Sequence, residues 1–323
     1  PDYARVLAWR QQQLARFEDD PELLASAKEW YAGRDLVRAG ATNPALYAER
    51  CVAWINHFVD TYDPRLIGAG RSPRLPMVLF RRQAEMVHFI YACMMGDASG
   101  LVEKTRDMGA TWVAGAVTVK EWTFQPGFVA GWGSNKSEQV DVLGNPKSIF
   151  EKLRMLIRAL PAPLRPAVAD GLDLKQHTCR NPDNEAVIDG EIGKNIGRGG
   201  RSRVYFVDEA AHLEHPEAVE ASLSENTRCR IDISSVSGPN TVFYRKRMAG
   251  AEWKPGQAVR RDVANVFVMY WSDHPDKTRE WYNERRAYFV AQGTPAVTAR
   301  EIDRDYMGAV EGVIIPYEHV EAA

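Results

Sequence analysis

One stretch in the first third of the chain, LVEKTRDMGATWV, carries residue types that can bind phosphate. In the common phosphate-binding pattern G-x-x-x-x-G-K-[ST], backbone N–H groups surround the phosphate, the lysine reaches the outer phosphates and the hydroxyl binds Mg²⁺. With Gly109 as the second glycine, Thr111 takes the Mg²⁺ position and Ala110 replaces the lysine. Lys104 and Arg106 supply cations from the start of the loop. The pattern predicts a nucleotide site, but a strand-to-helix turn with solvated charges explains it about as well.

A pair of carboxylates downstream favours the first interpretation. The apolar run 203–207 has the length and composition of a strand, and it ends in Asp208 and Glu209. A carboxylate at the tip of a buried strand can hold Mg²⁺, and a glutamate after it can orient the attacking water. The alternative is a strand that ends in a solvated acidic turn.

Two further segments are candidates for nucleotide contacts. Residues 231–240, IDISSVSGPN, predict a short strand whose tip places Ser237 and Asn240 beside a γ-phosphate, although Gly-Pro-Asn is also ordinary turn chemistry. Gln83, at the start of a predicted helix, can bond the adenine edge, and Arg82 can stack on the base. An exposed pair at a helix start is the competing interpretation.

The segment 193–203 contains four basic residues, four glycines and no acid. This composition suits a flexible loop that contacts a phosphate backbone or the nucleotide of a neighbouring subunit. A solvated connector is the alternative. The basic residues are Lys194, Arg198, Arg201 and Arg203.

Apolar runs of strand length alternate with helical patterns, which predicts an α/β fold with a mainly parallel sheet flanked by helices. The candidate phosphate, metal and hydrolysis residues all follow strands, so we expect them at the carboxyl edge of that sheet. Other expected elements are a strand at 128–132, a helix from Asn145 to Leu160, a hairpin within 174–192, a strand at 266–271 and a helix at 276–291 whose packing residues include Tyr288.

The first 62 residues predict a separate helical segment that serves as a lid or adaptor. Asp20-Pro21 and Asn43-Pro44 are helix-start signals, and Gly33 is a stop signal. The Pro, Gly, Ser and Arg cluster between Tyr62 and Pro76 indicates a linker.

Composition limits the alternatives. The chain has 323 residues, of which 45% are hydrophobic and 26% are charged, and its net charge of −2 gives no overall basic field for nucleic acid. Any DNA contact must therefore come from a local patch. The four cysteines have no metal-ligand spacing and are expected to be reduced core thiols. The sequence contains no run of about 18 apolar residues, so it does not predict a membrane span.

The motifs together resemble the large terminase subunits of tailed bacteriophages, which are DNA-packaging motors. The resemblance covers roughly residues 79–316. Its carriers are LFRRQ, EKTRDMGATW, GRGGRSRVYFVDEAAHL, ISSVSGPN and WSDHPDKTREWY. An early lysine in the phosphate loop is a departure that some large terminases share. The resemblance implies a P-loop NTPase of the additional-strand, catalytic-glutamate type.

It also implies an assignment for each candidate residue. Thr111 and Asp208 are expected to bind Mg²⁺, Glu209 to orient water and Arg106 to offset transition-state charge. From the basic loop itself, in a ring, Arg201 is the better candidate for an arginine finger, and Arg198 is expected to contact DNA or to support the loop. ATP is the expected substrate. The residues expected to contact it are Arg82, Gln83, Lys104, Thr105, Arg106, Asp107, Met108, Gly109, Ala110, Thr111, Trp112, Ser237 and Asn240.

The implied partners are double-stranded DNA, the portal protein, the small terminase subunit and further copies of the chain in a ring, expected to be pentameric, on the procapsid in the host cytoplasm. The implied domains are a helical segment at 1–62, an ATPase domain at 63–316 and a truncated linker at 317–323 towards a nuclease domain that is absent, so no nuclease activity is expected. Two alternatives remain: a related helicase or translocase, and a non-hydrolysing nucleotide-binding assembly module suggested by Ala110.

Overall fold

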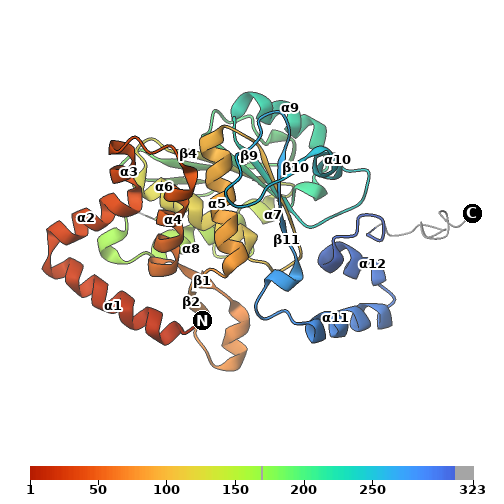
Figure 1. Cartoon of the computed structure of the whole chain (residues 1–323), viewed down its shortest axis with the longest axis horizontal. Coiled ribbons are helices and arrows are strands. Elements are labelled where there is room, and N and C mark those ends of the chain that lie inside the picture. The colour runs from red at the N-terminus through yellow and green to blue at the C-terminus, as the bar shows by residue number, and fades with distance from the viewer. Residues whose placement is uncertain (169, 310–323) are drawn as a thin grey trace, which may run out of the picture.

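In the computed structural model, which describes residues 1–168 and 170–309, a nine-stranded sheet crosses the molecule in the order β10-β11-β3-β9-β8-β4-β7-β6-β5 (Figure 1). Strands from β10 to β7 in this order all run parallel, whereas β6 is antiparallel to β5 and β7. The strand bounds are β3 Gly100–Lys104, β4 Val129–Ser134, β5 Leu174–Lys175, β6 Thr178–Arg180, β7 Val187–Ile192, β8 Val204–Asp208, β9 Arg230–Ser234, β10 Ala251–Glu252 and β11 Asn265–Met269.

The order of the central strands identifies the type of sheet. β9 lies between β3, which ends in Lys104, and β8, which ends in Asp208. This inserted strand is the feature that the additional-strand type of P-loop fold predicts, so the expected fold class is confirmed. Because parallel strands end at the same edge, Lys104, Asp208 and Ser234 reach one side of the sheet.

Both faces of the sheet are covered by helices, and most of the strand residues that face them are accordingly apolar. Val102 and Phe206 pack into the larger core with α5 (Arg81–Gly96), α6 (Ala110–Phe124) and α8 (Ile149–Ala159). Leu101 and Val207 face the other core with α9 (Pro216–Asn226) and α10 (Val242–Ala249). α6 is buried almost throughout, so the phosphate loop is joined to an element that does not move independently of the core.

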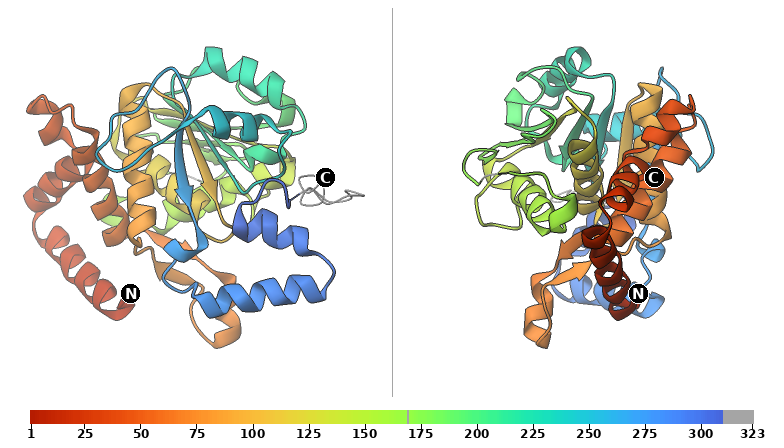
Figure 2. Two further views of the ribbon diagram at one scale, coloured as in Figure 1. Left: turned by 45° about the vertical axis from the view of Figure 1, so that its right-hand side comes forward. Right: turned by 90° about the vertical axis from the view of Figure 1, so that its left-hand side faces the viewer.

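The N-terminal helices pack on the larger core. They are α1 (Tyr3–Asp19), α2 (Pro21–Ala32), α3 (Arg34–Arg38) and α4 (Pro44–Phe58), and Figure 2 shows them on the opposite side of the molecule from α9. Asp20 and Asn43 accept hydrogen bonds at the starts of α2 and α4, and Gly33 ends α2 in the left-handed conformation, as predicted. Trp54 and Phe58 of α4 are fully buried in the core that α5 and α6 share.

Several local predictions were wrong. The predicted linker is an antiparallel hairpin, β1 (Asp60–Tyr62) and β2 (Arg74–Pro76), around the short helix η1 (Pro64–Ala69), because its prolines and glycines form a turn between two paired strands. α8 begins at Ile149, since residues 145–148 form a hydrogen-bonded turn. Tyr288 is 54% exposed on α11 (Arg279–Ala291), a helix without any buried residue.

Short elements complete the chain. They are α7 (Ser137–Val140), η2 (Ala162–Leu164), η3 (Gly193–Asn195), η4 (Ala210–His212), η5 (Trp271–Asp273), α12 (Pro295–Thr298) and the π-helical turn η6 (Ala299–Asp303). All four cysteines are buried and unpaired, as expected. Among the described residues, no helix combines the length and apolar character needed to cross a membrane. The predicted linker at 317–323 lies outside the described residues.

Candidate nucleotide site

The phosphate loop connects β3 to α6 through two residues in the left-handed backbone conformation. Asp107 and Gly109 have φ angles of 59° and 71°. A Cβ at position 109 would lie 2.7 Å from Nε2 of Gln83, so only glycine fits beside that amide. Alternation of left- and right-handed residues before a helix N-terminus is a typical anion-binding arrangement. The predicted strand–loop–helix is therefore confirmed, from Lys104 to Thr111.

The two predicted Mg²⁺ ligands lie side by side. Oγ1 of Thr111 donates a hydrogen bond to Oδ2 of Asp208 at 3.0 Å, although the two residues come from α6 and β8. Oδ1 of Asp208 is buried and has no hydrogen-bond partner among the described residues. A carboxylate oxygen without a partner, next to a hydroxyl, fits a hard divalent cation that prefers oxygen ligands. Burial and the neighbouring Glu209 raise the pKa of Asp208 to about 6.

Glu209 is held by a lysine and a serine from two other strands. Nζ of Lys104 lies 3.3 Å from Oε1 of Glu209, and the hydroxyl of Ser234, at the end of β9, donates to Oε2 at 3.4 Å. Burial raises the pKa of Glu209, but the charges of Lys104 and His212 outweigh burial and lower it overall. Burial lowers the pKa of Lys104, and the two carboxylates more than reverse that effect. Glu209 is therefore ionised at neutral pH.

Glu209 also has a strained backbone, with a φ of 54° in the left-handed region. Non-glycine residues in this region cost about 1–3 kcal/mol and occur often at functional sites. This left-handed conformation turns the chain between β8 and η4, so that Asp208 and Glu209 can both face the loop.

The remaining predicted contacts are only partly brought to this site. Nε2 of Gln83 donates to the Met108 carbonyl at 3.1 Å, so its amide contacts the loop itself. Arg82 lies with its guanidinium 4.0 Å from the Phe267 ring centroid and donates to the Val268 carbonyl. Its stacking on a nucleotide base remains a prediction.

Within the loop, the side chains differ in what they can offer a ligand. The Thr105 hydroxyl donates to the Ile302 carbonyl at 2.9 Å, and Met108 and Ala110 are buried. Trp112 packs against the larger core. Arg106 is 69% exposed and lies 3.8 Å from Glu301, so it is the loop side chain that is free to turn towards a phosphate.

The predicted serine of the third segment is not the one that reaches Glu209. Ser234 does so, because β9 ends there, whereas Asn240 is exposed several residues further along. Among the described residues, neither Ser237 nor Asn240 hydrogen-bonds to Lys104, Asp208 or Glu209, and their place beside a γ-phosphate remains a prediction. The position of Ser234 at the end of its strand could have indicated its contact with Glu209, because polar residues at the ends of parallel strands meet at the carboxyl edge of the sheet.

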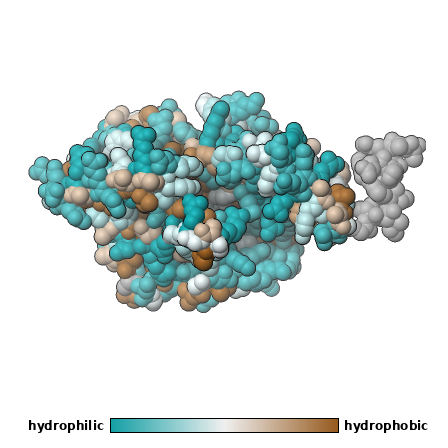
Figure 3. Space-filling view, turned by 90° about the horizontal axis from the view of Figure 1, so that it is seen from below, coloured by the Kyte–Doolittle hydropathy of each residue, from teal (hydrophilic) through white to brown (hydrophobic). Residues whose placement is uncertain are grey.

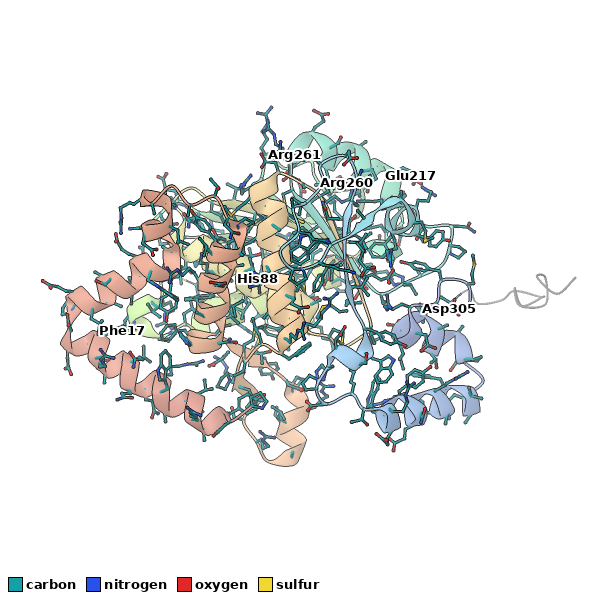
Figure 4. The ribbon with its side chains drawn as sticks, in the orientation of Figure 1. Phe17, His88, Glu217, Arg260, Arg261 and Asp305 are labelled. Atoms are coloured by element: carbon teal, nitrogen blue, oxygen red, sulfur yellow. The ribbon has the colours of Figure 1, made fainter. Side chains whose placement is uncertain are left out.

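Arg201 lies away from this centre. The Arg203 backbone donates to the carbonyl of Val129 at the start of β4, and the Arg203 side chain pairs with Asp97 at the end of α5. Arg203 therefore lies at the amino edge of the sheet. Arg260 and Arg261, which precede β11, lie at the same edge, at the top of Figure 4. In the described residues Lys194, Arg198 and Arg201 are exposed and have no ion-pair partner. Within one chain, Arg201 therefore does not join Lys104, Thr111, Asp208 and Glu209.

Three charged residues near the loop were missed by the sequence analysis. Lys277, which precedes α11, donates to the Arg106 carbonyl, and Glu301 accepts from the Arg106 amide through its own carbonyl at 2.8 Å. Lys152 in α8 is close enough to feel the charges of Asp208 and Glu209, although burial lowers its pKa. No motif spacing connects these residues with the loop, because tertiary packing alone brings them there.

The edge that carries the site faces downwards in Figure 1. Seen from that side, the surface is mainly hydrophilic with scattered hydrophobic residues (Figure 3). Such a surface suits a charged, water-soluble ligand.

Comparison with known proteins gives matches among solved structures alone. No family model matches the chain, and no curated protein matches it. The large terminase of bacteriophage HK97 superposes with a TM-score of 0.51 and 14% identity over 80% of this chain and 55% of that one, so the chain spans about half of the HK97 protein. The ATPase domain of the Thermus phage P74-26 large terminase matches with a TM-score of 0.47 and 21% identity, over 64% of this chain and 88% of that one. In fold, the chain is therefore similar to a bacteriophage large terminase, as its motifs predicted.

Proposed function

We propose that this chain is the ATP-hydrolysing motor domain of a viral large terminase, which drives double-stranded DNA into a procapsid in the host cytoplasm. The observation that carries the proposal is the group of four side chains at the carboxyl edge. Thr111 contacts Asp208, whose second oxygen is free, and Lys104 contacts Glu209. The similarity of fold to the HK97 large terminase supports the choice among P-loop motors.

In this proposal each side chain has one task. The loop amides and Lys104 bind the β- and γ-phosphates of ATP, and Thr111 and Asp208 hold Mg²⁺. When bound, Mg²⁺ neutralises the charge that develops on the phosphate oxygens. Lys104 also supplies the cation that Ala110 cannot, which argues against a module that has lost hydrolysis.

Glu209 orients the attacking water. Its ionised carboxylate can accept a hydrogen bond from water once phosphate draws Lys104 away, and Ser234 keeps the other oxygen in place. Arg106 is exposed at the mouth of the loop and can turn towards the transferred phosphoryl group. Most of the catalysis then comes from positioning and electrostatics.

The proposed partners are DNA, the portal protein, the small terminase subunit and other copies of the chain in a ring. The basic residues of segment 193–203 support a contact with phosphate, since Arg198 and Arg201 are exposed and without ion-pair partners in the described structure. Arg201 lies far from its own site, so its proposed role as a finger requires the site of a neighbouring copy.

Phosphate release from ATP tests the proposal. We expect release that requires Mg²⁺ and stops with a chelator, and we expect the rate per chain to rise by about 10³-fold or more on portal-bearing procapsids with double-stranded DNA, where a finger is supplied by a neighbour. The rate is measured for the isolated chain and for the assembled ring. No release above the chelator control in either state would overturn the proposed function.

A further inference from the structure

The backbone of the phosphate loop is held from outside by polar groups that the hydrolysis mechanism does not use. The ammonium of Lys277 donates to the Arg106 carbonyl, and the Arg106 amide donates to the Glu301 carbonyl at 2.8 Å. The Gln83 amide donates to the carbonyl of Met108 at 3.1 Å. Both backbone groups of Arg106 are thus bound by a later part of the chain: the carbonyl by Lys277, 171 residues further along, and the amide by Glu301 within η6.

Lys277 is half-buried beside the loop. Its Nζ lies 3.8 Å from the Met108 sulfur and 4.8 Å from the Trp281 ring centroid. Burial lowers its pKa to about 8, Lys104, Arg65 and Arg285 act in the same direction, and Asp107 opposes them. Placing a charged lysine near these cations costs electrostatic free energy, which another interaction must offset.

The geometry of an anion-binding loop supplies that interaction. When consecutive N–H groups of a loop point inwards at a phosphate, carbonyls of the same peptide units must point outwards. An outward carbonyl takes its hydrogen bond from water or from a protein donor, and a charged donor makes a stronger hydrogen bond than a neutral one. Lys277 and Gln83 are the side-chain donors at two such carbonyls, those of Arg106 and Met108.

We propose that Lys277 is a positioning residue for the phosphate loop: its hydrogen bond to the Arg106 carbonyl, together with the Glu301 carbonyl on the Arg106 amide, keeps the loop in its phosphate-binding form. It acts through the loop and does not touch the reacting atoms. The identity of the ligand, ATP, rests on the proposed function, whereas the effect on the loop does not.

Amide hydrogen exchange without nucleotide tests the effect on the loop. In Lys277→Met the Arg106 amide should exchange about tenfold faster or more, because a charge-assisted hydrogen bond is lost next to it. The Thr105 amide, which donates to the Met269 carbonyl at 2.9 Å within the sheet, is the internal reference and should keep its rate. Lys254→Met, an exposed lysine after β10, is the matched control. Equal Arg106 exchange in wild type and Lys277→Met would overturn the proposal.

The pH dependence of nucleotide binding separates positioning from general packing. Bound triphosphate favours the protonated ammonium, so the wild-type affinity for Mg²⁺ and a non-hydrolysable ATP analogue should fall as pH rises through the lowered pKa of Lys277, by about tenfold between about pH 7.5 and 9.5. Lys277→Arg keeps the donor but does not titrate in this range, so it should bind like wild type at pH 7.5 and lose little affinity at pH 9.5.

The outcomes distinguish the two claims. The same decline with pH in wild type and Lys277→Arg would contradict the role of Lys277. A wild-type chain that binds no nucleotide at any pH would instead refute the proposed function, and the exchange rates of Arg106 and Thr105 would still decide whether Lys277 holds the loop.

Discussion

Replacing Glu209 with glutamine should reduce ATP hydrolysis by about 10²–10⁴-fold, the range expected when a positioned general base is lost. ATP affinity should change only a few fold, because Glu209 is proposed to orient water and not to hold Mg²⁺ or phosphate. Glutamine keeps the shape of the side chain and its hydrogen bond with Ser234, but it cannot take a proton from water. The measurements are single-turnover phosphate release and equilibrium binding of a fluorescent ATP analogue.

The matched control is Glu217→Gln. Glu217 lies on α9 (Figure 4) and its side chain is 73% exposed in an ion pair with Arg245, so its replacement should leave both quantities unchanged. If Glu209→Gln retained more than about a tenth of the wild-type turnover, Glu209 would not be the residue that activates water.

Asp208→Asn is expected to reduce hydrolysis by at least about 10²-fold, because it removes the negative charge that holds the metal. In contrast to the Glu209 variant, it should also raise the Mg²⁺ concentration needed for half-maximal ATP binding. The measurement is a Mg²⁺ titration of binding and of phosphate release. Asp262→Asn is the control, since Asp262 is exposed in an ion pair with Arg260 at the opposite edge of the sheet.

The melting temperature of Asp208→Asn provides a second measurement, which should rise although hydrolysis falls. Burial and Glu209 raise the pKa of Asp208 to about 6 in the folded protein. The protonated carboxyl therefore stabilises the fold fully below the ordinary pKa of aspartate, and this contribution is lost as pH rises through about 6. At pH 7 the ionised carboxylate therefore destabilises the fold, and Asp208→Asn should raise the melting temperature. An unchanged Mg²⁺ requirement would contradict the assignment of Asp208 as a metal ligand.

The sequence was sufficient to predict the mainly parallel sheet and the strand ends that meet at its carboxyl edge. Val204 to Val207 of β8 form a continuous apolar run because helices cover both faces of the sheet, and such a run is easily recognised. β3 and β9 also carry buried charged residues, Glu103 and Asp232. Since those strands are parallel, the polar residues after them had to meet at one edge, which is why Thr111 and Asp208 are in contact as expected.

The contacts that the sequence did not predict depend on tertiary packing or on the residue at which a strand ends. Ser234 and not Ser237 reaches Glu209, because β9 ends a few residues earlier than the predicted tip. Lys277 and Glu301 contact the loop through a segment remote in sequence, without any spacing that indicates it. Glycines and prolines at 62–76 indicated a linker, but the same residues build the turn of a hairpin.

The crystal structure of the Glu209→Gln variant with ATP and Mg²⁺ is the most direct test of the proposed site. The variant should trap unhydrolysed nucleotide. We expect its β- and γ-phosphates within the loop from Lys104 to Thr111, and Mg²⁺ bound through Thr111 Oγ1, with Asp208 beside it. Nucleotide bound elsewhere on the chain, or a metal that contacts neither Thr111 nor Asp208, would contradict the assignment of this edge of the sheet as the ATPase site.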